Sequence, residues 1–202
     1  KWAGEPFILS PWQGYFIAQI FGWVHRDDED SRRYRTAYVY VARKSGKSQL
    51  AAGIAMAMAA LDRDGAPEYV FAATTRQQAR IVFDEVSRSI RKAPEKARRL
   101  FDVRRHDIFT PRDGTMKPVS SDAHTLDGLS LNLGVVDEFH AHKTSELLDV
   151  LKSSMGSRKS PLLLAITTAG FLPEGPCANA MQMGKDVLDG IKQDERTLNM
   201  IY

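Results

Sequence analysis

The stretch AYVYVARKSGKS at residues 37–48 decides the fold of this chain. Its first five residues are apolar and rich in valine and tyrosine, which predicts a short buried strand. An Ala- and Met-rich run at residues 49–61 follows and predicts a helix. Between the two lies a basic loop that ends in Gly-Lys-Ser. A loop of this kind between a strand and a helix is the setting that a phosphate-binding loop requires.

The residue types at the end of this loop suit a triphosphate. The N-terminus of a helix points free N–H groups at an anion, and Gly46 lets the backbone approach that anion closely. Lys47 can reach the β- and γ-phosphates, and the hydroxyl of Ser48 can ligate Mg²⁺. We therefore expect ATP and Mg²⁺ to bind at this loop.

Three further loop residues belong to the candidate site, and one position departs from the usual motif. Arg43, Lys44 and Ser45 precede Gly46, and the two cations would suit a triphosphate. The usual motif has a glycine five residues before Gly46, where this chain has Val41. A chance Gly-Lys-Ser at the start of a helix is therefore the alternative interpretation.

A second motif ends another apolar run. Residues 131–136 read LNLGVV and are followed by Asp137 and Glu138, roughly 90 residues after Lys47. In phosphate-loop enzymes a strand-terminal Asp holds the Mg²⁺ water shell, and an adjacent Glu polarises the attacking water as general base. An acidic turn after a strand is the alternative. Two independent motifs, each at the carboxyl end of its strand, favour the enzyme.

Two histidines and two threonines lie near these motifs. For His140 and His142 three interpretations are open: a plain surface position, a hydrogen-bonding role near the γ-phosphate, or a metal site. Their spacing and the lack of a nearby cysteine disfavour the metal. Thr167 and Thr168 follow the apolar run at residues 161–166, where hydroxyls can sense a nucleotide or merely form a turn. The position beside the Asp-Glu strand favours sensing.

The rest of the chain alternates between strand and helix patterns. Strands are predicted at residues 37–41, 69–73, 131–136 and 161–166, with two short strands within 107–119. Helices are predicted at residues 11–23, 49–61, 76–90, 145–154 and 174–193, and a charged loop at 25–35. This alternation predicts an α/β fold with a mainly parallel sheet and helices on both faces. A length of 202 residues fits one such domain.

Composition narrows the class of protein. The chain is 43% hydrophobic and 26% charged, as in ordinary globular proteins, and it has no apolar run long enough to cross a membrane. The N-terminus lacks the pattern of a signal peptide. A single cysteine, Cys177, excludes an internal disulfide and fits a reducing compartment. We therefore expect a cytoplasmic protein with no membrane partner.

Basic side chains gather in one part of the chain. The net charge of +3 is too small to identify a nucleic-acid partner. The cluster consists of Arg88, Arg91, Lys92, Lys96, Arg98, Arg99, Arg104, Arg105 and Arg112. Such a stretch is either a solvated helix face or a surface that contacts phosphates.

Several motifs together resemble one family. These are ARKSGKS at residues 42–48, VVDEFHAH at 135–142 and ITTAG at 166–170, with PWQ at 11–13, ATTRQQA at 73–79 and the segment at 121–128. In this order and context they resemble the large terminase subunit of tailed phages, in the branch typified by phage HK97. The resemblance covers nearly the whole chain.

The resemblance implies a RecA-like, additional-strand P-loop ATPase over residues 1–202. By this resemblance Lys47 and Arg43 hold phosphates, Gln13 reads adenine, and Thr167 and Thr168 couple hydrolysis to movement. The candidate metal ligands remain Ser48 and Asp137, and the candidate base remains Glu138. The nuclease domain that such proteins carry after the ATPase domain is expected to be absent from these residues.

The resemblance also implies partners. Large terminases form a ring on the viral portal protein in the host cytoplasm, act with a small terminase subunit, and pump double-stranded DNA into a procapsid. Ring motors commonly complete the active site with an arginine of the neighbouring subunit. We expect Arg158 in that role, or as a surface arginine, with Lys159 and Arg112 as further candidates.

Two rival functions stay open. The Asp-Glu-Phe-His run at residues 137–140 resembles the box of superfamily 2 helicases. A helicase needs a second RecA-like domain, for which 202 residues leave no room. A nucleotide-binding module that no longer hydrolyses ATP is the non-enzymatic rival, and the intact Glu138 argues against it.

Overall fold

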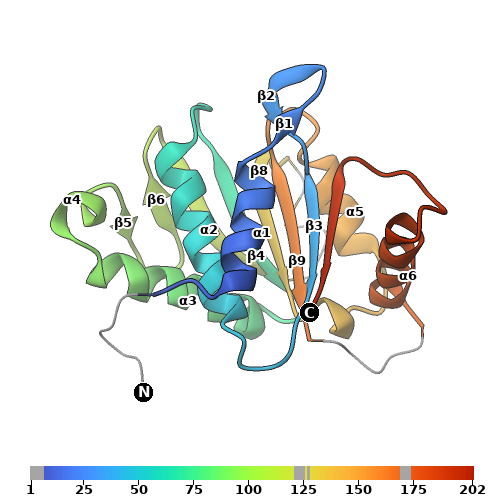
Figure 1. Ribbon diagram of the computed structural model, residues 1–202. Helices are drawn as coiled ribbons and strands as arrows, with labels where there is room; N and C mark the ends of the chain where they lie inside the picture. The colour runs from blue at the N-terminus through green and yellow to red at the C-terminus, as the bar shows by residue number, and fades with distance from the viewer. Residues whose placement is uncertain (1–6, 121–125, 127, 169–173) are drawn as a thin grey trace.

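The computed structural model describes residues 7–120, 126, 128–168 and 174–202 (Figure 1). Within them, eight strands form one sheet in the order β10-β3-β9-β8-β4-β7-β6-β5. Their bounds are β3 (Thr36–Tyr40), β4 (Glu68–Ala73), β5 (Asp102–Val103), β6 (Ile108–Thr110), β7 (Gly114–Ser120), β8 (Leu131–Asp137), β9 (Leu162–Thr167) and β10 (Thr197–Ile201). The six strands from β10 to β7 pair in parallel, whereas β6 and β5 are antiparallel. The predicted α/β fold with a mainly parallel sheet is confirmed.

Helices cover both faces of this sheet (Figure 1). One face packs against α1 (Pro11–Phe21), α2 (Lys47–Leu61) and α3 (Arg76–Lys92). The other face packs against α5 (Glu146–Ser153) and α6 (Pro176–Leu188). Every residue of the central strands β8 and β9 is buried, because a parallel sheet between two helical layers has no solvent-facing side.

The strand order brings the two sequence motifs to one edge of the sheet. Strand β9 lies between β3, which precedes the basic loop, and β8, which ends in the acidic pair. Because all three strands are parallel, their carboxyl ends meet at one edge of the sheet. The two sequence motifs therefore lie at the same edge, separated by one inserted strand, as an additional-strand ATPase fold requires.

Several elements differ from the predictions. The segment predicted as a charged loop forms a hairpin of β1 (Val24–His25) and β2 (Asp28–Arg32). A short helix α4 (Glu95–Arg98) and strand β5 occupy the basic stretch. The last helix ends at Leu188, followed by Gly190 with a φ of 74°, a left-handed conformation that suits a glycine after a helix.

Strand β10 is the main element that the sequence did not predict. Among the described strands it pairs with β3 alone, and its side chains are half-buried except for the exposed Ile201. The segment TLNMI has no strong alternation, and its pairing partner lies about 160 residues earlier in the chain. Its strand conformation is thus set by tertiary contacts.

Within the described ranges no helix is both long and apolar enough to cross a membrane.

A close contact fixes α6 against β10. A Cβ atom on Gly184 would lie 2.6 Å from the Cγ and Oδ1 atoms of Asn199 and 3.0 Å from its Cβ. Because the Asn199 Cβ cannot rotate away, only glycine allows this approach. Gly184 is therefore the residue that lets the final strand dock beneath the helix.

We expect Gly184→Ala to lower the free energy of unfolding by about 1–3 kcal/mol, because the added methyl group overpacks this contact. The matched control is Gly53→Ala in α2, where a Cβ would meet no atom within 4 Å. That change should raise the free energy of unfolding by about 0.5–1 kcal/mol through helix propensity. Urea unfolding measures both, and equal shifts would contradict the proposed packing.

Candidate active site

The basic loop closes on itself at the carboxyl end of β3. The Ser45 hydroxyl donates to the Ala42 carbonyl at 2.7 Å, and α2 begins at Lys47. Lys44 and Gly46 both adopt left-handed backbone conformations, with φ values of 65° and 77°. These turns lead directly into the N-terminus of α2, where free N–H groups favour an anion.

Val41 shows why this loop dispenses with the usual first glycine. Its side chain is fully buried in the core, and its N–H donates to the Thr167 carbonyl at 3.1 Å. The residue thus continues the pairing between β3 and β9 by one position. Its φ is not positive, so no glycine is required there.

Gln13 of α1 lies against the loop. Its side chain is buried, accepts a hydrogen bond from the Ser10 N–H at 2.9 Å and donates to the Ser45 carbonyl at 3.3 Å. A Cβ on Gly46 would lie only 3.1 Å from the Gln13 Nε2 atom. The first helix therefore clamps the loop through this one amide. The structure brings Gln13 to the candidate site, where its amide bonds the loop backbone.

The acidic pair lies at the end of β8. Asp137 is buried, and its carboxylate accepts the Glu138 N–H at 2.8 Å. Burial raises the pKa of Asp137 above its usual value, and the nearby positive charge of Lys47 partly opposes that rise. Glu138 has a left-handed backbone conformation with a φ of 49°, which turns the chain sharply after the strand. Its carboxylate remains accessible to solvent.

The residues present fit a magnesium ion. A buried carboxylate whose charged form is disfavoured gains from a bound cation, and carboxylate and hydroxyl oxygens are ligands that Mg²⁺ prefers. Ser48 and Asp137 are the residues that would hold it, and the ion would neutralise charge on the phosphates. Nδ1 of His140 contacts Thr167, whereas the buried Nε2 of His142 has no hydrogen-bond partner in the described part of the chain. Among the described residues no three or more His, Cys, Asp or Glu side chains gather into a metal site.

His140 joins the acidic turn to the neighbouring strand. Its backbone N–H donates to the Thr167 hydroxyl at 3.2 Å, and its Nδ1 lies 2.7 Å from the same oxygen. That hydroxyl donates its own proton to the Thr168 carbonyl at 3.0 Å. When this hydroxyl donates to the Thr168 carbonyl, it accepts from Nδ1, and the proton of the imidazole ring then lies on Nδ1.

The same Nδ1 lies 3.2 Å from a carboxylate oxygen of Glu138. Its proton is thus shared between Glu138 and Thr167, and the ring links the candidate base to β9. Sequence analysis left three roles open for His140, and nothing in the local pattern could select this one, since Thr167 lies 27 residues away.

His142 is buried against the other side of the acidic strand. Burial lowers its pKa, and a hydrogen bond with the Asp137 backbone partly opposes that shift. Its ring also packs near Phe139, with the ring centroids 6.4 Å apart. Neither histidine is a plain surface residue, and His142 contributes to the packing that holds Asp137.

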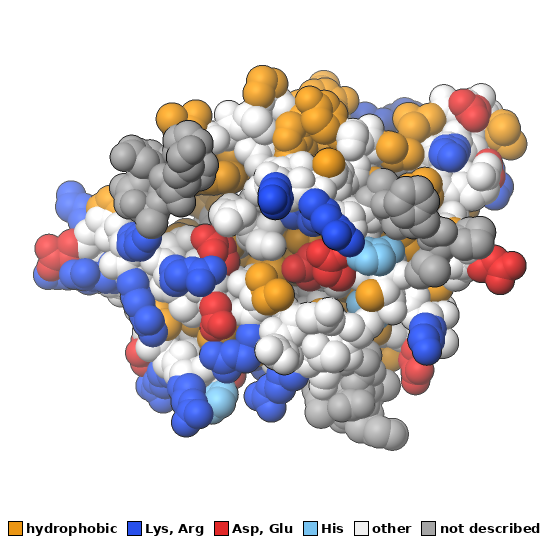
Figure 2. Space-filling model, turned by 90° about the horizontal axis from the view of Figure 1, so that it is seen from below, with side chains coloured by type: hydrophobic (Ala, Val, Ile, Leu, Met, Phe, Trp, Pro, Cys, Tyr) orange, Lys and Arg blue, Asp and Glu red, His pale blue; other side chains and the backbone are white. Residues whose placement is uncertain are grey.

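The carboxyl edge of the sheet forms one face of the molecule. Figure 2 shows acidic side chains and a histidine at the centre of this face, with basic side chains beside them. A broad group of lysines and arginines covers the side of the face on which α3, α4 and β5 lie. The face combines an acidic centre with a surface suited to anions.

Comparisons with known proteins identify the family. Residues 11–186 match the family model of the terminase large subunit, ATPase domain. The chain belongs to this family.

Two relatives agree with this assignment. The large terminase subunit of Enterobacteria phage HK97 is 27% identical over 174 residues, which cover 83% of this chain and 33% of that protein. Protein YmfN of Escherichia coli (strain K12) is 40% identical over 76 residues, 38% of this chain and 17% of that protein. The chain therefore spans about a third or less of the length of these relatives.

Solved structures of terminases share the fold. The crystal structure of the HK97 large terminase matches 99% of this chain and 40% of that chain, with a TM-score of 0.80 and 23% identity. The large terminase of a thermophilic bacteriophage, solved in complex with ADP, matches 98% of this chain and 45% of that chain, with a TM-score of 0.65 and 15% identity. The RecA-like fold of a terminase ATPase domain is thereby confirmed.

Arg158, expected to act across a subunit interface, makes structural contacts within its own terminase domain. Its guanidinium donates to the carbonyls of Ser130, Gly65 and Ala66 at 3.0, 3.0 and 2.8 Å, and lies 3.7 Å from Asp64. Its side chain is only 12% exposed.

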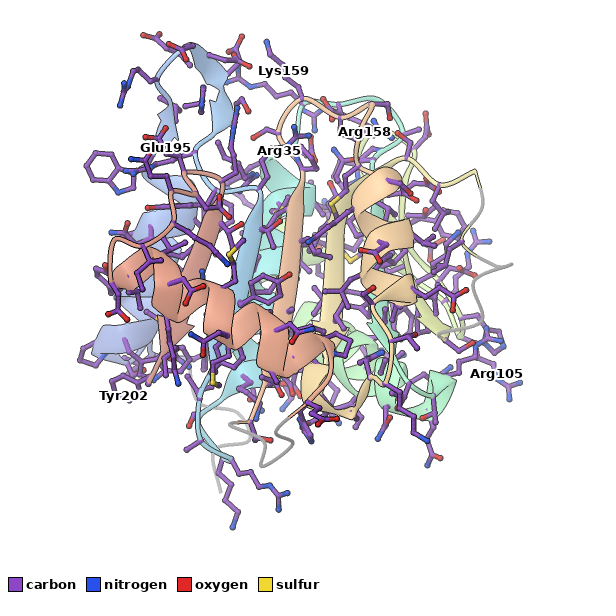
Figure 3. The ribbon with its side chains drawn as sticks, turned by 90° about the vertical axis from the view of Figure 1, so that its right-hand side faces the viewer. Arg35, Arg105, Arg158, Lys159, Glu195 and Tyr202 are labelled. Atoms are coloured by element: carbon purple, nitrogen blue, oxygen red, sulfur yellow. The ribbon has the colours of Figure 1, made fainter. Side chains whose placement is uncertain are left out.

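These contacts lie at the amino edge of the sheet, opposite the active site. Figure 3 shows Arg158 and Lys159 at the end of the molecule opposite Tyr202, which follows β10 at the carboxyl edge. Arg112 precedes β7 at the same amino edge, and its carbonyl accepts the Ala66 N–H. Within its own subunit Arg158 holds three carbonyls, and a role of Arg158, Lys159 or Arg112 across an interface stays a prediction.

We expect Arg158→Ala to lower the free energy of unfolding by about 1–3 kcal/mol, because three carbonyls lose their donor. Lys159→Ala should leave the urea midpoint unchanged, since its ion pair with Asp30 is exposed. ATP hydrolysis per folded molecule should survive both changes. If Arg158→Ala keeps its stability but loses activity only in assembled rings, Arg158 acts on the site of the neighbouring subunit.

Proposed function

We propose that this domain hydrolyses ATP in the presence of Mg²⁺ and drives double-stranded DNA into a viral procapsid. The observation that carries the proposal is the convergence of Lys47, Asp137 and Glu138 at one edge of the sheet, with His140 joining Glu138 to Thr167. Family membership supports the motor role, and the related terminase of the thermophilic phage was solved with ADP bound.

Each residue has a defined part in this proposal. The loop N–H groups, Lys47 and Arg43 hold the phosphates, with Lys44 and Ser45 completing the loop. Ser48 and Asp137 hold Mg²⁺, which supplies charge neutralisation. Gln13, in the first turn of α1, binds the adenine base. Its amide then gives up part of its hydrogen bonding with the loop.

The hydrolytic step falls to Glu138. Its carboxylate takes a proton from the attacking water, whose oxygen then attacks the γ-phosphorus as the bond to the β-phosphate oxygen breaks. The proton shared from His140 Nδ1 orients this carboxylate before the nucleotide arrives. Thr167 and Thr168, at the end of β9, sense the hydrolysis of the nucleotide and couple it to movement of the DNA.

Assembly and location follow the family in this proposal. The domain acts as part of a ring on the portal protein, with a small terminase subunit, on the procapsid in the host cytoplasm. A further fold relative, the Phi-28 gp11 DNA packaging motor, bears the same activity in its name, with a TM-score of 0.53 and 14% identity. A helicase is the rival, and an assay for strand separation distinguishes the two.

We expect Glu138→Gln to bind ATP normally but to lose turnover by at least about 100-fold, because it keeps size and shape but removes the base. A coupled assay of phosphate release in saturating Mg²⁺ measures turnover, and a fluorescent nucleotide measures binding. Glu146→Gln, in the exposed first turn of α5, is the matched control. Hydrolysis by the Glu138 variant at nearly the wild-type rate would exclude it as the base.

We expect His140→Ala to lower kcat by up to about 100-fold with little change in KM, since a base that loses its orienting donor is misplaced for attack. Thr167→Val should act in the same direction, whereas Thr167→Ser keeps the hydroxyl and most of the rate. The melting temperature separates positioning from stability. If KM rises and kcat stays constant, His140 belongs to nucleotide binding instead.

A further inference from the structure

A groove runs between α3 and the hairpin of β5 and β6. Its volume is about 530 Å³, and its walls carry five arginines and a single carboxylate. The arginines are Arg80, Arg88, Arg91, Arg104 and Arg105, and the carboxylate is Asp84. Among the residues that the structure describes, no lysine lines the groove. A concave surface with this charge excess attracts a polyanion.

Two of these arginines build the walls. Arg80 donates to Asp84 at 3.2 Å and to the Arg105 carbonyl at 3.3 Å, which joins helix to hairpin. Arg104 bonds Asp102 at 2.9 Å and stacks over the Phe109 ring. Their charges are thus partly neutralised, and their side chains are held in place.

A third arginine, Arg88, forms an ion pair with Glu85 within α3. The remaining two arginines of the groove have no such partner within the described part of the chain. The guanidinium groups of Arg91 and Arg105 form no hydrogen bond or ion pair with any residue that the structure describes. One belongs to the helix wall and the other to the hairpin wall. The groove therefore presents two unneutralised guanidiniums on opposite sides.

The groove lies on the same side of the molecule as the active site. Figure 3 shows Arg105 and Tyr202 on opposite sides of the lower half of the view, with Arg158 near the top. Figure 2 shows the surrounding basic side chains on the face that also carries the acidic centre. Strands β4 and β7 separate the hairpin from β8, so a polymer bound there would share the carboxyl face with the nucleotide residues without touching the same strands.

The lining chemistry identifies the kind of ligand. A guanidinium offers two parallel N–H donors that match a phosphate, and it keeps its charge at every working pH. Within the described part of the chain, no Asn or Gln side chain, which would read adenine edges, lines the groove. Contacts of this kind hold a nucleic-acid backbone without regard to its sequence, as translocation along a genome requires.

We propose that Arg91 and Arg105 grip the phosphate backbone of double-stranded DNA in this groove. The inference rests on the proposed function, because it assigns the DNA substrate of that motor to one surface. It also decides between the two interpretations of the basic stretch in favour of phosphate contact.

The test is the double variant Arg91→Gln and Arg105→Gln. Glutamine is chosen because Arg91 lies in the last turn of α3, where a negative charge would oppose the helix dipole. The matched control is Arg26→Gln with Lys185→Gln, which removes the same charge from exposed positions on the β1–β2 hairpin and α6. Affinity for a short fluorescent duplex of arbitrary sequence is measured over a series of salt concentrations.

The groove variant should bind more weakly, and the slope of log affinity against log salt should flatten by about 1.8, or 0.9 for each lost phosphate contact. Stimulation of ATP hydrolysis by DNA should fall, while hydrolysis without DNA stays unchanged. The control should keep the wild-type slope. A second variant, Arg91→Lys with Arg105→Lys, should keep the slope but lose some affinity, because charge remains and paired donors are lost.

The outcomes separate the groove from the motor. If wild type binds duplex and the groove variant keeps its slope, the groove assignment is overturned and the proposed function stands. If wild type neither binds duplex nor responds to it, the proposed function itself is overturned. Competition by an acidic polypeptide but not by duplex, lost in the groove variant, would assign the surface to a protein and overturn the inference.

Discussion

The parallel pairing of β3, β9 and β8 is the constraint on which the site depends. Thr36 through Tyr40 pair with Leu163 through Thr167, and the strand beyond aligns Asp137 with Ile166. The backbone bond from Val41 to Thr167 extends this ladder into the phosphate loop. A slip by one residue would exchange the side chains that pack against the two helical layers and would separate the loop from the carboxylates. Register thus positions the chemistry.

Within this frame, burial and turning of the chain give each carboxylate its own character. Asp137 ends its strand inside the protein, where its charge is costly without a cation. Glu138 follows in a left-handed turn and emerges toward solvent beside His140. Two neighbouring carboxylates thereby suit two tasks, metal binding and proton transfer. They can do so because the turn of the backbone places one in a buried and the other in an exposed environment.

Sequence patterns predicted those parts of the fold that rest on local burial, and the site shows the same division. The strands β8 and β9 are mostly apolar, so their conformations followed from composition. The conformations of β1, β2 and β10 depend instead on their pairing partners. Lys47 and Asp137 entered the prediction because their motifs are contiguous. The positions of Arg158 and His140 depend on contacts across 93 and 27 residues. A surface arginine and a three-carbonyl clamp look alike in sequence, and only the folded chain distinguishes them.

The clamp at the amino edge has a mechanical consequence. Arg158 holds the loops before β4 and β8, and Arg35 in turn donates to the Arg158 carbonyl at 3.1 Å (Figure 3). The loops at the amino edge are thereby tied to one another, while the loops at the carboxyl edge carry the nucleotide residues. A conformational change that follows nucleotide binding is therefore expected among the loops of the carboxyl edge.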